Sequence, residues 1–491
     1  MKIAQLIRSC GILLALFVFT VIPTSTAFGQ LGGGGGGFGG GGGGGGFGGG
    51  GLGGGGLGGG GGNQDSAGVI VDADGVLRMK LYRDPRGTLQ KQRFLAARAA
   101  LNPQLAKPSQ MRKISLTRLE QAISKRLEAN EPLTNEMKYL AGLLRLQYVF
   151  YYPETNDIVI AGPAEGFAED LAGRARGLST GRAVIELQDL ITALRAFAPG
   201  QEPTRLIGCS IDPTQEGLQR MQQFLARVGR QITPNQTAQI VRGLKQSLGK
   251  QIVTINGVSP KSHFAQVLVE ADYRMKLIGI GLERPPVKMK SYVERTNPSA
   301  VSRNALSRWY FVPDYKAVRM SDDEMAMELV GWGVKLVGAE ELVTRGGNLE
   351  ASGRGNRASR SWCSEFTEKY PSIADREPVY AQLRNLIDLS VAAAFMQKKQ
   401  LFSQANWDLG VFADEQKLPV EIYEVPRQVE SAINAIWRGN SLMTPIGGGV
   451  ELEPMQALKT SNLISENKQE VTKARQSVKV DQLKEGQWWW D

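Results

Sequence analysis

The spacing of apolar residues predicts helices and strands in alternation along most of the chain. The clearest helix is 259–283, because apolar residues recur there every three or four positions and so share one face. Those residues are Phe264, Val267, Leu268, Ala271 and Met275. Ser259-Pro260 suits a helix start, and the polar Glu270, Arg274 and Lys276 are expected to point away from the buried face.

Hairpins and strand-helix pairs account for much of the remaining pattern. Residues 69–81 alternate around Asp74-Gly75, and residues 148–161 form a second hairpin pattern around a polar turn. Further on, strands alternate with helices. The segments 205–229 and 252–279 resemble two copies of one strand-turn-helix unit, either through duplication or as two separate solutions to one packing problem. The pattern predicts an α+β fold with mixed αβ layers.

Changes in composition divide the 491 residues into segments, and a chain of this length allows two or three domains at roughly 150 residues each. The expected segments are a signal peptide (1–29), a disordered glycine-rich tether (30–67), a basic region of hairpin and helices (68–180), a strand-helix domain (181–290), a strand-rich domain with a long helical segment (291–455) and a polar tail ending in tryptophan (456–491).

The first residues have the pattern of a signal peptide. Lys2 and Arg8 precede the apolar core 11–22, and small residues at Ala27 and Gly29 stand where a signal peptidase acts, so cleavage is expected between Gly29 and Gln30. The apolar core has twelve residues, whereas a bilayer span needs roughly 20. An uncleaved anchor is the alternative. After cleavage, no membrane span is expected.

Residues 31–62 are nearly pure glycine, with twenty-seven glycines among them. Glycine loses the most backbone entropy on ordering and has no side chain to bury, so the segment is expected to be a disordered tether. Its few apolar residues also allow self-association, and this alternative stays open. They are Leu31, Phe38, Phe47, Leu52 and Leu57.

Positive charge is concentrated in residues 76–130, where thirteen Lys or Arg face three acidic residues. The whole chain carries +10. Arg112, Lys113 and Arg118 are the candidate binding residues for an anionic polymer. The expected helix in this segment has an apolar stripe that takes the buried face, so the charged residues occupy its other faces. This arrangement favours charges that only contact solvent. We therefore expect polyanion binding to be weak and to be lost at physiological salt.

The C-terminal Trp488, Trp489 and Trp490 form a second candidate binding site. Tryptophan stacks on sugars and docks in apolar grooves, although a tail that folds back onto its own domain would use the same residues. The preceding residues 465–486 are so charged that they are expected to be a linker.

The residues of common catalytic sites are scarce or lie in the wrong context. His263 is the only histidine and is expected to be a surface or boundary residue. With two cysteines in the mature chain it leaves no zinc set. The G-x-S-x-G match at 177–181 lacks the strand-turn-helix order that a nucleophile elbow requires. Cys209 lies in an apolar strand, so we expect a buried thiol that is not bridged to Cys363. No cofactor is expected, and paired carboxylates remain open.

Several stretches together resemble a family of exported planctomycete bacterial proteins that is catalogued only as a domain of unknown function. The resemblance covers roughly residues 146–454 and implies export, but no activity, cofactor or site residue. The stretches that carry it are HFAQVLVEADYRMKLIGIGLE (263–283), RWYFVPDY (308–315), ELVGWGVKLV (328–337), FTEKY (366–370) and VYAQLRNLIDLSVAAAF (379–395).

These observations favour an exported, non-enzymatic αβ protein that binds or assembles in the periplasm or cell envelope. The residues do not identify the partner, and an envelope protein or a polysaccharide is compatible with them. Two alternatives stay open, namely a secreted hydrolase with paired carboxylates and a polyanion-binding protein that acts through residues 76–130. The protein is expected in the periplasm, on the cell surface or outside the cell.

We predict that the mature protein begins at Gln30, because the short apolar core ends just before small residues that suit a signal peptidase. Intact mass of protein recovered from the cell envelope measures this directly. A chain that still begins at Met1 would identify the segment as an anchor.

Overall fold

The computed structural model describes residues 66–81, 84, 86–228, 233–296, 305–331, 333–343, 349–351, 357–434, 436–438, 441–443, 448–466 and 468–491. These residues belong to one compact unit. The expected signal peptide, the cleavage residues Gly29 and Gln30 and the tether up to residue 65 lie outside the described residues. The first described strand begins at Ser66, two residues before the expected start of the folded region.

Two large sheets form the framework, and in the described residues most strand pairs are antiparallel. The nine-stranded sheet has the order β1 (Ser66–Val71), β2 (Val76–Leu81), β15 (Gln428–Glu430), β9 (Lys250–Asn256), β8 (Ile207–Asp212), β18 (Gly449–Leu452), β10 (Ala305–Pro313), β13 (Val334–Val343) and β14 (Leu349–Ala351). The six-stranded sheet has the order β11 (Val318–Met320), β12 (Ala326–Leu329), β4 (Tyr148–Tyr152), β5 (Asp157–Ala164), β3 (Ser109–Ser115) and β19 (Trp489–Trp490).

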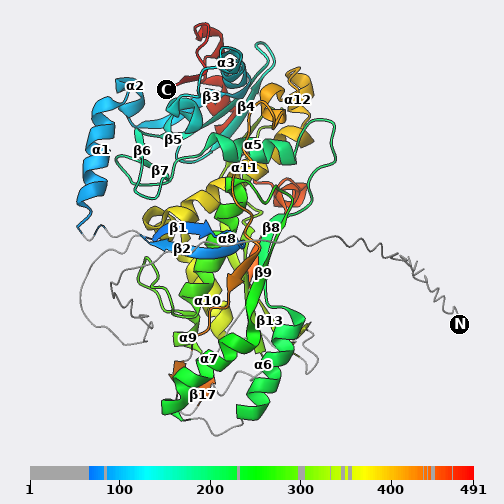
Figure 1. The fold of residues 1–491 in the computed structure, drawn as a ribbon. Coiled ribbons are helices and arrows are strands. Elements are labelled where there is room, and N and C mark those ends of the chain that lie inside the picture. The colour runs from blue at the N-terminus through cyan, green and yellow to red at the C-terminus, as the bar shows by residue number, and fades with distance from the viewer. Residues whose placement is uncertain are drawn as a thin grey trace, which may run out of the picture. The chain divides into compact units, whose positions relative to one another are not determined.

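Helices of very different lengths accompany these sheets (Figure 1). The longer ones are α1 (Thr88–Ala100), α3 (Leu116–Glu128), α5 (Leu187–Ala196), α6 (Gln215–Val228), α7 (Thr237–Leu248), α8 (His263–Gly279), α10 (Arg357–Arg376) and α11 (Pro378–Lys398). The short ones are α2 (Pro103–Ala106), α4 (Asn135–Lys138), α9 (Tyr292–Arg295), α12 (Leu401–Gln404), α13 (Pro454–Ala457) and α14 (Glu470–Gln476). Two small hairpins, β6 (Phe167–Glu169) with β7 (Ala175–Gly177) and β16 (Ile436–Arg438) with β17 (Ser441–Met443), complete the order.

The expected α+β class and both expected hairpins are confirmed. β1 pairs with β2 around Gly75, and β4 pairs with β5 around the turn at 153–156. The strands of the two similar units, β8 and β9, are antiparallel neighbours. Their helices differ in surroundings, because α6 packs with α7 in a small separate cluster whereas α8 belongs to the main core.

α8 and α11 lie side by side in the main core and are enclosed on nearly every side (Figure 1). In α11, all residues from Val379 to Met396 are buried. A helix that is buried all round needs apolar residues on every face, and any charged residue in it requires a partner from another element.

The structure corrects two expectations for α8. The helix starts one turn later than Ser259-Pro260, because the hydroxyl of Ser262 accepts a hydrogen bond from the Ala265 amide at 3.2 Å and caps it. In addition, Glu270, Arg274 and Lys276 are buried instead of pointing to solvent. The apolar stripe therefore marks only one of several faces that are covered.

The charged C-terminal segment 465–486 is not a linker, which corrects the expectation from its composition. Val471, Val478 and Val480 are buried in a cluster with side chains of β4 and β5. Trp489 and Trp490 pair with β3, and the Ser115 amide donates to the Trp488 carbonyl at 2.9 Å. The tail folds back because it covers a strand that would otherwise be a sheet edge.

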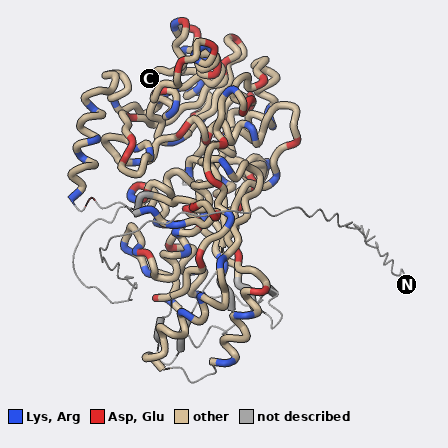
Figure 2. The backbone as a smooth tube through the Cα atoms, in the orientation of Figure 1, with Lys and Arg blue, Asp and Glu red and all other residues tan. Residues whose placement is uncertain are grey.

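Most of the described basic residues of 76–130 lie on four elements, namely β2, α1, β3 and α3. β2 belongs to the nine-stranded sheet and β3 to the six-stranded one. Figure 2 shows Lys and Arg interspersed with Asp and Glu along the described chain. The concentration of charge in the sequence is therefore distributed over separate elements in space.

A left-handed turn precedes the segment that carries Arg145. Leu140, Ala141 and Gly142 all have positive φ, at 41°, 49° and 81°. A Cβ atom at Gly142 would lie 2.1 Å from the Glu165 carbonyl oxygen, so glycine alone fits there. After this turn the chain runs beside β5, where the Leu144 amide donates to the Pro163 carbonyl at 2.8 Å.

We predict that Gly142→Ala destabilises the protein by about 3 kcal/mol or more, because it adds a backbone clash to an unfavourable φ. Urea unfolding measures the change. Gly173→Ala is the matched control, since Gly173 also has a positive φ of 86° but open space around its Cβ, and about 1 kcal/mol is expected. Equal losses in the two variants would contradict the role of the close contact.

Candidate functional site

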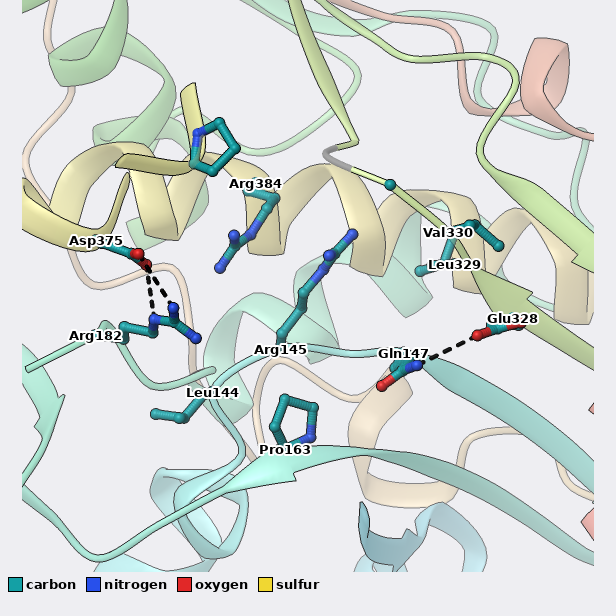
Figure 3. Close-up of a pocket in the computed structure, with 12 residues that line it drawn as sticks. Leu144, Arg145, Gln147, Pro163, Arg182, Glu328, Leu329, Val330, Asp375 and Arg384 are labelled. Carbon is teal, nitrogen blue, oxygen red and sulfur yellow. Dashed lines mark hydrogen bonds and ion pairs between the residues drawn. The ribbon is translucent and has the colours of Figure 1, made fainter. Parts of the chain in front are cut away.

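A pocket of about 490 Å³ is lined by three arginines from separate parts of the chain (Figure 3). Small-molecule pockets commonly have volumes of roughly 300–1,000 Å³. Its lining residues are Leu144, Arg145, Gln147, Pro163, Arg182, Glu328, Leu329, Val330, Gly331, Pro371, Asp375 and Arg384. The pocket thus combines apolar walls with several charged groups.

Each arginine is placed by a different element. Arg145 follows the left-handed turn and precedes β4, and Arg182 lies just after the turn that follows β7. Arg384 lies on the buried helix α11. Figure 3 shows the side chain of Arg384 pointing into the space beside Arg145 and Arg182.

Arg384 is the unusual member of this group. The residue is 7 % exposed, its Nε atom is buried without an acceptor, and no hydrogen bond or ion pair of its guanidinium occurs among the described residues. A buried charge normally has a partner, because removing it from water is costly. Here the pocket is the remaining place from which a partner can come.

The other two arginines already have acidic partners. Arg145 donates through Nε to Asp388 at 2.9 Å, and one of its terminal nitrogens is buried without an acceptor. Arg182 forms a two-bond ion pair with Asp375, at 2.7 and 3.1 Å. Asp388 lies one helical turn after Arg384 but forms its ion pair with Arg145, so Arg384 has no directly bound acid among the described residues.

The electrostatics agree with this geometry. Burial lowers the pKa of Arg384, the neighbouring charge of Arg145 lowers it further, and the charge of Asp388 opposes the shift. Burial raises the pKa of Asp388, and Arg145 opposes that shift. An anion in the pocket would relieve the crowding of positive charge, and guanidinium groups bind carboxylates and phosphates through paired hydrogen bonds.

Gly333 keeps the space beside these groups open. Its φ is 75°, and an added Cβ would lie 3.1 Å from an oxygen of Asp388 and within 4 Å of side-chain atoms of Arg384 and Arg145. Glycine at this position therefore allows the chain to pass close to Asp388 and the two arginines.

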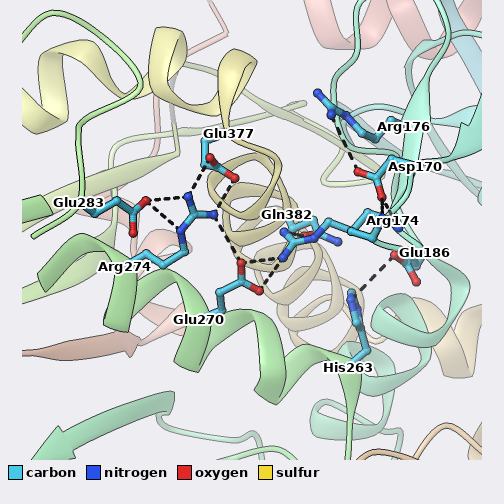
Figure 4. Close-up of polar contacts among 11 residues, drawn as sticks. Asp170, Arg174, Arg176, Glu186, His263, Glu270, Arg274, Glu283, Glu377 and Gln382 are labelled. Carbon is cyan, nitrogen blue, oxygen red and sulfur yellow. Dashed lines mark hydrogen bonds and ion pairs between the residues drawn. The ribbon is translucent and has the colours of Figure 1, made fainter. Parts of the chain in front are cut away.

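A second polar cluster lies along α8 and contains only paired charges (Figure 4). Arg174 contacts both oxygens of Glu270 at 2.6 Å. Arg274 binds Glu283 and Glu377, with shortest distances of 2.6 and 2.7 Å. These pairs connect α8 to the β6–β7 hairpin and to the start of α11, so the cluster joins elements and is not an open site.

His263 lies at the end of this cluster and is largely buried. Its Nδ1 atom is 3.0 Å from both oxygens of Asp189, and its Nε2 atom is 3.9 Å from Glu186. Burial lowers the pKa of His263, but the charges of Asp189 and Glu186 outweigh burial and raise it to about 9. The imidazole is therefore protonated at neutral pH and unsuited to act as a general base.

Comparison with known families identifies one part of the chain. Residues 209–292 match the family described as "Protein of unknown function (DUF1598)". These residues form a DUF1598 domain. No curated protein and no solved structure matches the chain. The match agrees with the expected domain of unknown function.

The DUF1598 domain contains α8 and with it His263, Glu270 and Arg274. Arg145, Arg182 and Arg384 all lie outside the matched residues. The pocket is therefore formed by segments before and after the DUF1598 domain.

The residues expected to bind partners are brought together at β3 and β19. Arg112 is fully buried, pairs with Asp491 at 2.8 Å and lies 4.9 Å from the ring centre of Trp489. Lys113 lies in the same strand pair, and burial lowers its pKa. Arg118 pairs with Asp157. Trp488 is buried, while Trp489 and Trp490 are half-buried. A binding role for these residues stays a prediction.

Cys209 and Cys363 are both buried and no disulfide joins them, as expected. Burial raises the pKa of the Cys209 thiol. Within the described ranges, no three His, Cys, Asp or Glu side chains are grouped to hold a metal ion. No described helix has both the length and the apolar character needed to cross a membrane.

No local sequence pattern indicates the arginine pocket, because its residues are far apart in the chain and follow no motif. One feature of the sequence does point to an internal polar site. Arg384 and Asp388 are the charged residues in the largely apolar stretch 379–395, whose apolar residues recur at helical spacing. Charges inside such a helix indicate either an exposed face or an internal polar site.

We predict that His263 stabilises the fold in a pH-dependent manner. Its folded pKa is raised, so its contribution is complete below the ordinary value near 6.5 and is lost as the pH rises through about 9. The groups that face it are Asp189, Glu186, Arg174 and Tyr423.

Urea unfolding of the wild type and His263→Gln at several pH values measures this contribution. We expect a difference on the order of 2 kcal/mol near pH 6 that shrinks as the pH rises from about 6.5 and is nearly gone above about 9. Because the chain has no second histidine, no other imidazole contributes. A difference that is independent of pH would contradict the prediction.

Proposed function

We propose that this is an exported, non-enzymatic binding protein of the cell envelope that holds a small organic anion between Arg145, Arg182 and Arg384. The observation that carries the proposal is the buried guanidinium of Arg384, which has no acceptor among the described residues and lies in a pocket of about 490 Å³. The ligand group would be a carboxylate or a phosphate, since both accept paired hydrogen bonds from arginine.

The charges of the pocket support binding over catalysis. Its two lining carboxylates, Glu328 and Asp375, are each ion-paired with an arginine. A hydrolase with paired carboxylates needs one carboxylate that acts as acid and one that acts as base or nucleophile. Both carboxylates are already bound by arginines, so this pocket gives that alternative no support.

Export rests on the sequence. The apolar core 11–22, the small residues before Gln30 and the resemblance to exported planctomycete bacterial proteins support an envelope location. The glycine-rich stretch 31–62 would then separate the binding domain from the point of attachment or assembly. The polyanion-binding alternative lacks a comparable observation, because Arg112 and Arg118 are engaged in internal ion pairs.

We predict that Arg384→Met weakens the binding of simple anions at least about tenfold without loss of stability. The first effect follows from the lost charge-assisted hydrogen bonds. The second follows because an apolar side chain removes an uncompensated buried charge, so the variant should unfold at an equal or higher temperature. Isothermal titration with acetate, succinate and inorganic phosphate, together with thermal unfolding, measures both.

Arg126→Met is the matched control, since Arg126 is a partly exposed arginine that pairs with Glu131 on the surface. It should leave anion binding unchanged. Arg384→Lys should retain part of the affinity, because the charge remains while the paired geometry is lost. Unchanged binding in Arg384→Met, or a clear loss of stability with no anion bound by the wild type, would overturn the proposal.

A further inference from the structure

The end of the pocket opposite Arg384 is lined by different polar groups from those at the arginine end. Figure 3 shows Arg182 and Arg384 on one side of the pocket and Gln147 with Glu328 on the other. Leu329 and Val330 line the same pocket next to Glu328. The two ends therefore present opposite kinds of polar group to one enclosed space.

Glu328 belongs to a cluster with an excess of negative charge. Its carboxylate is 2.8 Å from Arg319, and the same nitrogen of Arg319 is 2.5 Å from Glu470. One guanidinium is thus shared between two carboxylates. Burial and the charge of Glu328 raise the pKa of the neighbouring Tyr148 to about 12, so its hydroxyl stays protonated and adds no charge.

Gln147 adds a hydrogen-bond acceptor at this end. Its amide nitrogen donates to Glu328 at 3.3 Å and to the Tyr148 hydroxyl at 3.2 Å. This pattern assigns the nitrogen to the Glu328 side, and Figure 3 shows the amide oxygen turned away from Glu328. A carbonyl oxygen beside a carboxylate is a suitable site for an ammonium group, which has only donors.

We infer that the ligand is a zwitterion with a carboxylate at Arg384 and an amine at Gln147 and Glu328, that is, an amino acid or a short peptide. This inference rests on the proposed function and names the chemical class of its ligand. The positive end binds the carboxylate, the negative end binds the ammonium group, and the apolar residues between them contact the carbon chain. A phosphate or a simple carboxylic acid would satisfy only one end.

Pairs of probes that differ only in the amine test the inference. Isothermal titration compares diglycine and triglycine with their N-acetylated forms, and γ-aminobutyrate with butyrate. In at least one pair, we expect the free amine to bind about tenfold tighter or more, because it gains a charged hydrogen bond. Equal affinity within every pair would overturn the inference, while binding of the acetylated forms that depends on Arg384 would leave the proposed function intact.

Two variants locate the amine site. Glu328→Gln and Gln147→Leu should each remove the preference for the free amine and leave the affinity for the acetylated forms unchanged. Using two variants separates recognition from folding, because Gln147→Leu keeps the ion pair between Glu328 and Arg319. Retention of the preference in both variants would overturn the assignment.

Asp375→Asn is the matched control at the positive end. Asp375 is also a lining carboxylate, but it pairs with Arg182. Its replacement should strengthen binding of both members of each pair and leave their ratio unchanged, because Arg182 then becomes available to the ligand carboxylate. Loss of the amine preference in this control would contradict the placement of the two ends.

Discussion

The enclosure of α8 and α11 is the constraint on which the polar organisation of this protein depends. Both helices are buried on nearly every face and both carry charged side chains. Since charges removed from water need partners, acidic and basic residues of other elements are drawn to these helices. Glu270 and Arg274 on α8 receive their partners from the β6–β7 hairpin, the chain after α8 and the residue before α11.

The same constraint distinguishes structural charges from the candidate site. Asp388 on α11 is ion-paired with Arg145, whereas Arg384, one turn earlier, has no ion pair or hydrogen-bond acceptor in the described structure and adjoins a cavity. Ion pairs hold the helices against neighbouring elements, and the guanidinium of Arg384, which has no such pair among the described residues, is available to bind a ligand. Stability and function would then be in opposition at Arg384, as is common for binding sites.

The position of the C-terminal segment follows from the need of backbone polar groups for hydrogen-bond partners. β3 would present unpaired amides and carbonyls at the edge of the six-stranded sheet, and the last residues of the chain cover them. The fully buried Arg112 then receives Asp491 and the ring of Trp489. The last residues of the chain are in this way joined in one sheet with a strand that lies more than 370 residues earlier.

The sequence by itself determined the elements whose signals are local. The hairpins at Gly75 and at 153–156, the alternation of strands and helices, the α+β class and the buried Cys209 all follow from spacing and turn residues over short stretches. Tertiary structure alone decided which charges are buried, as for Glu270, Arg274 and Lys276, and that the polar tail is a strand partner. It also decided the pocket, because Arg145, Arg182 and Arg384 meet only when distant elements pack. Burial and pairing are properties of the three-dimensional surroundings, and periodicity reports one face of a helix without reporting how many faces are covered.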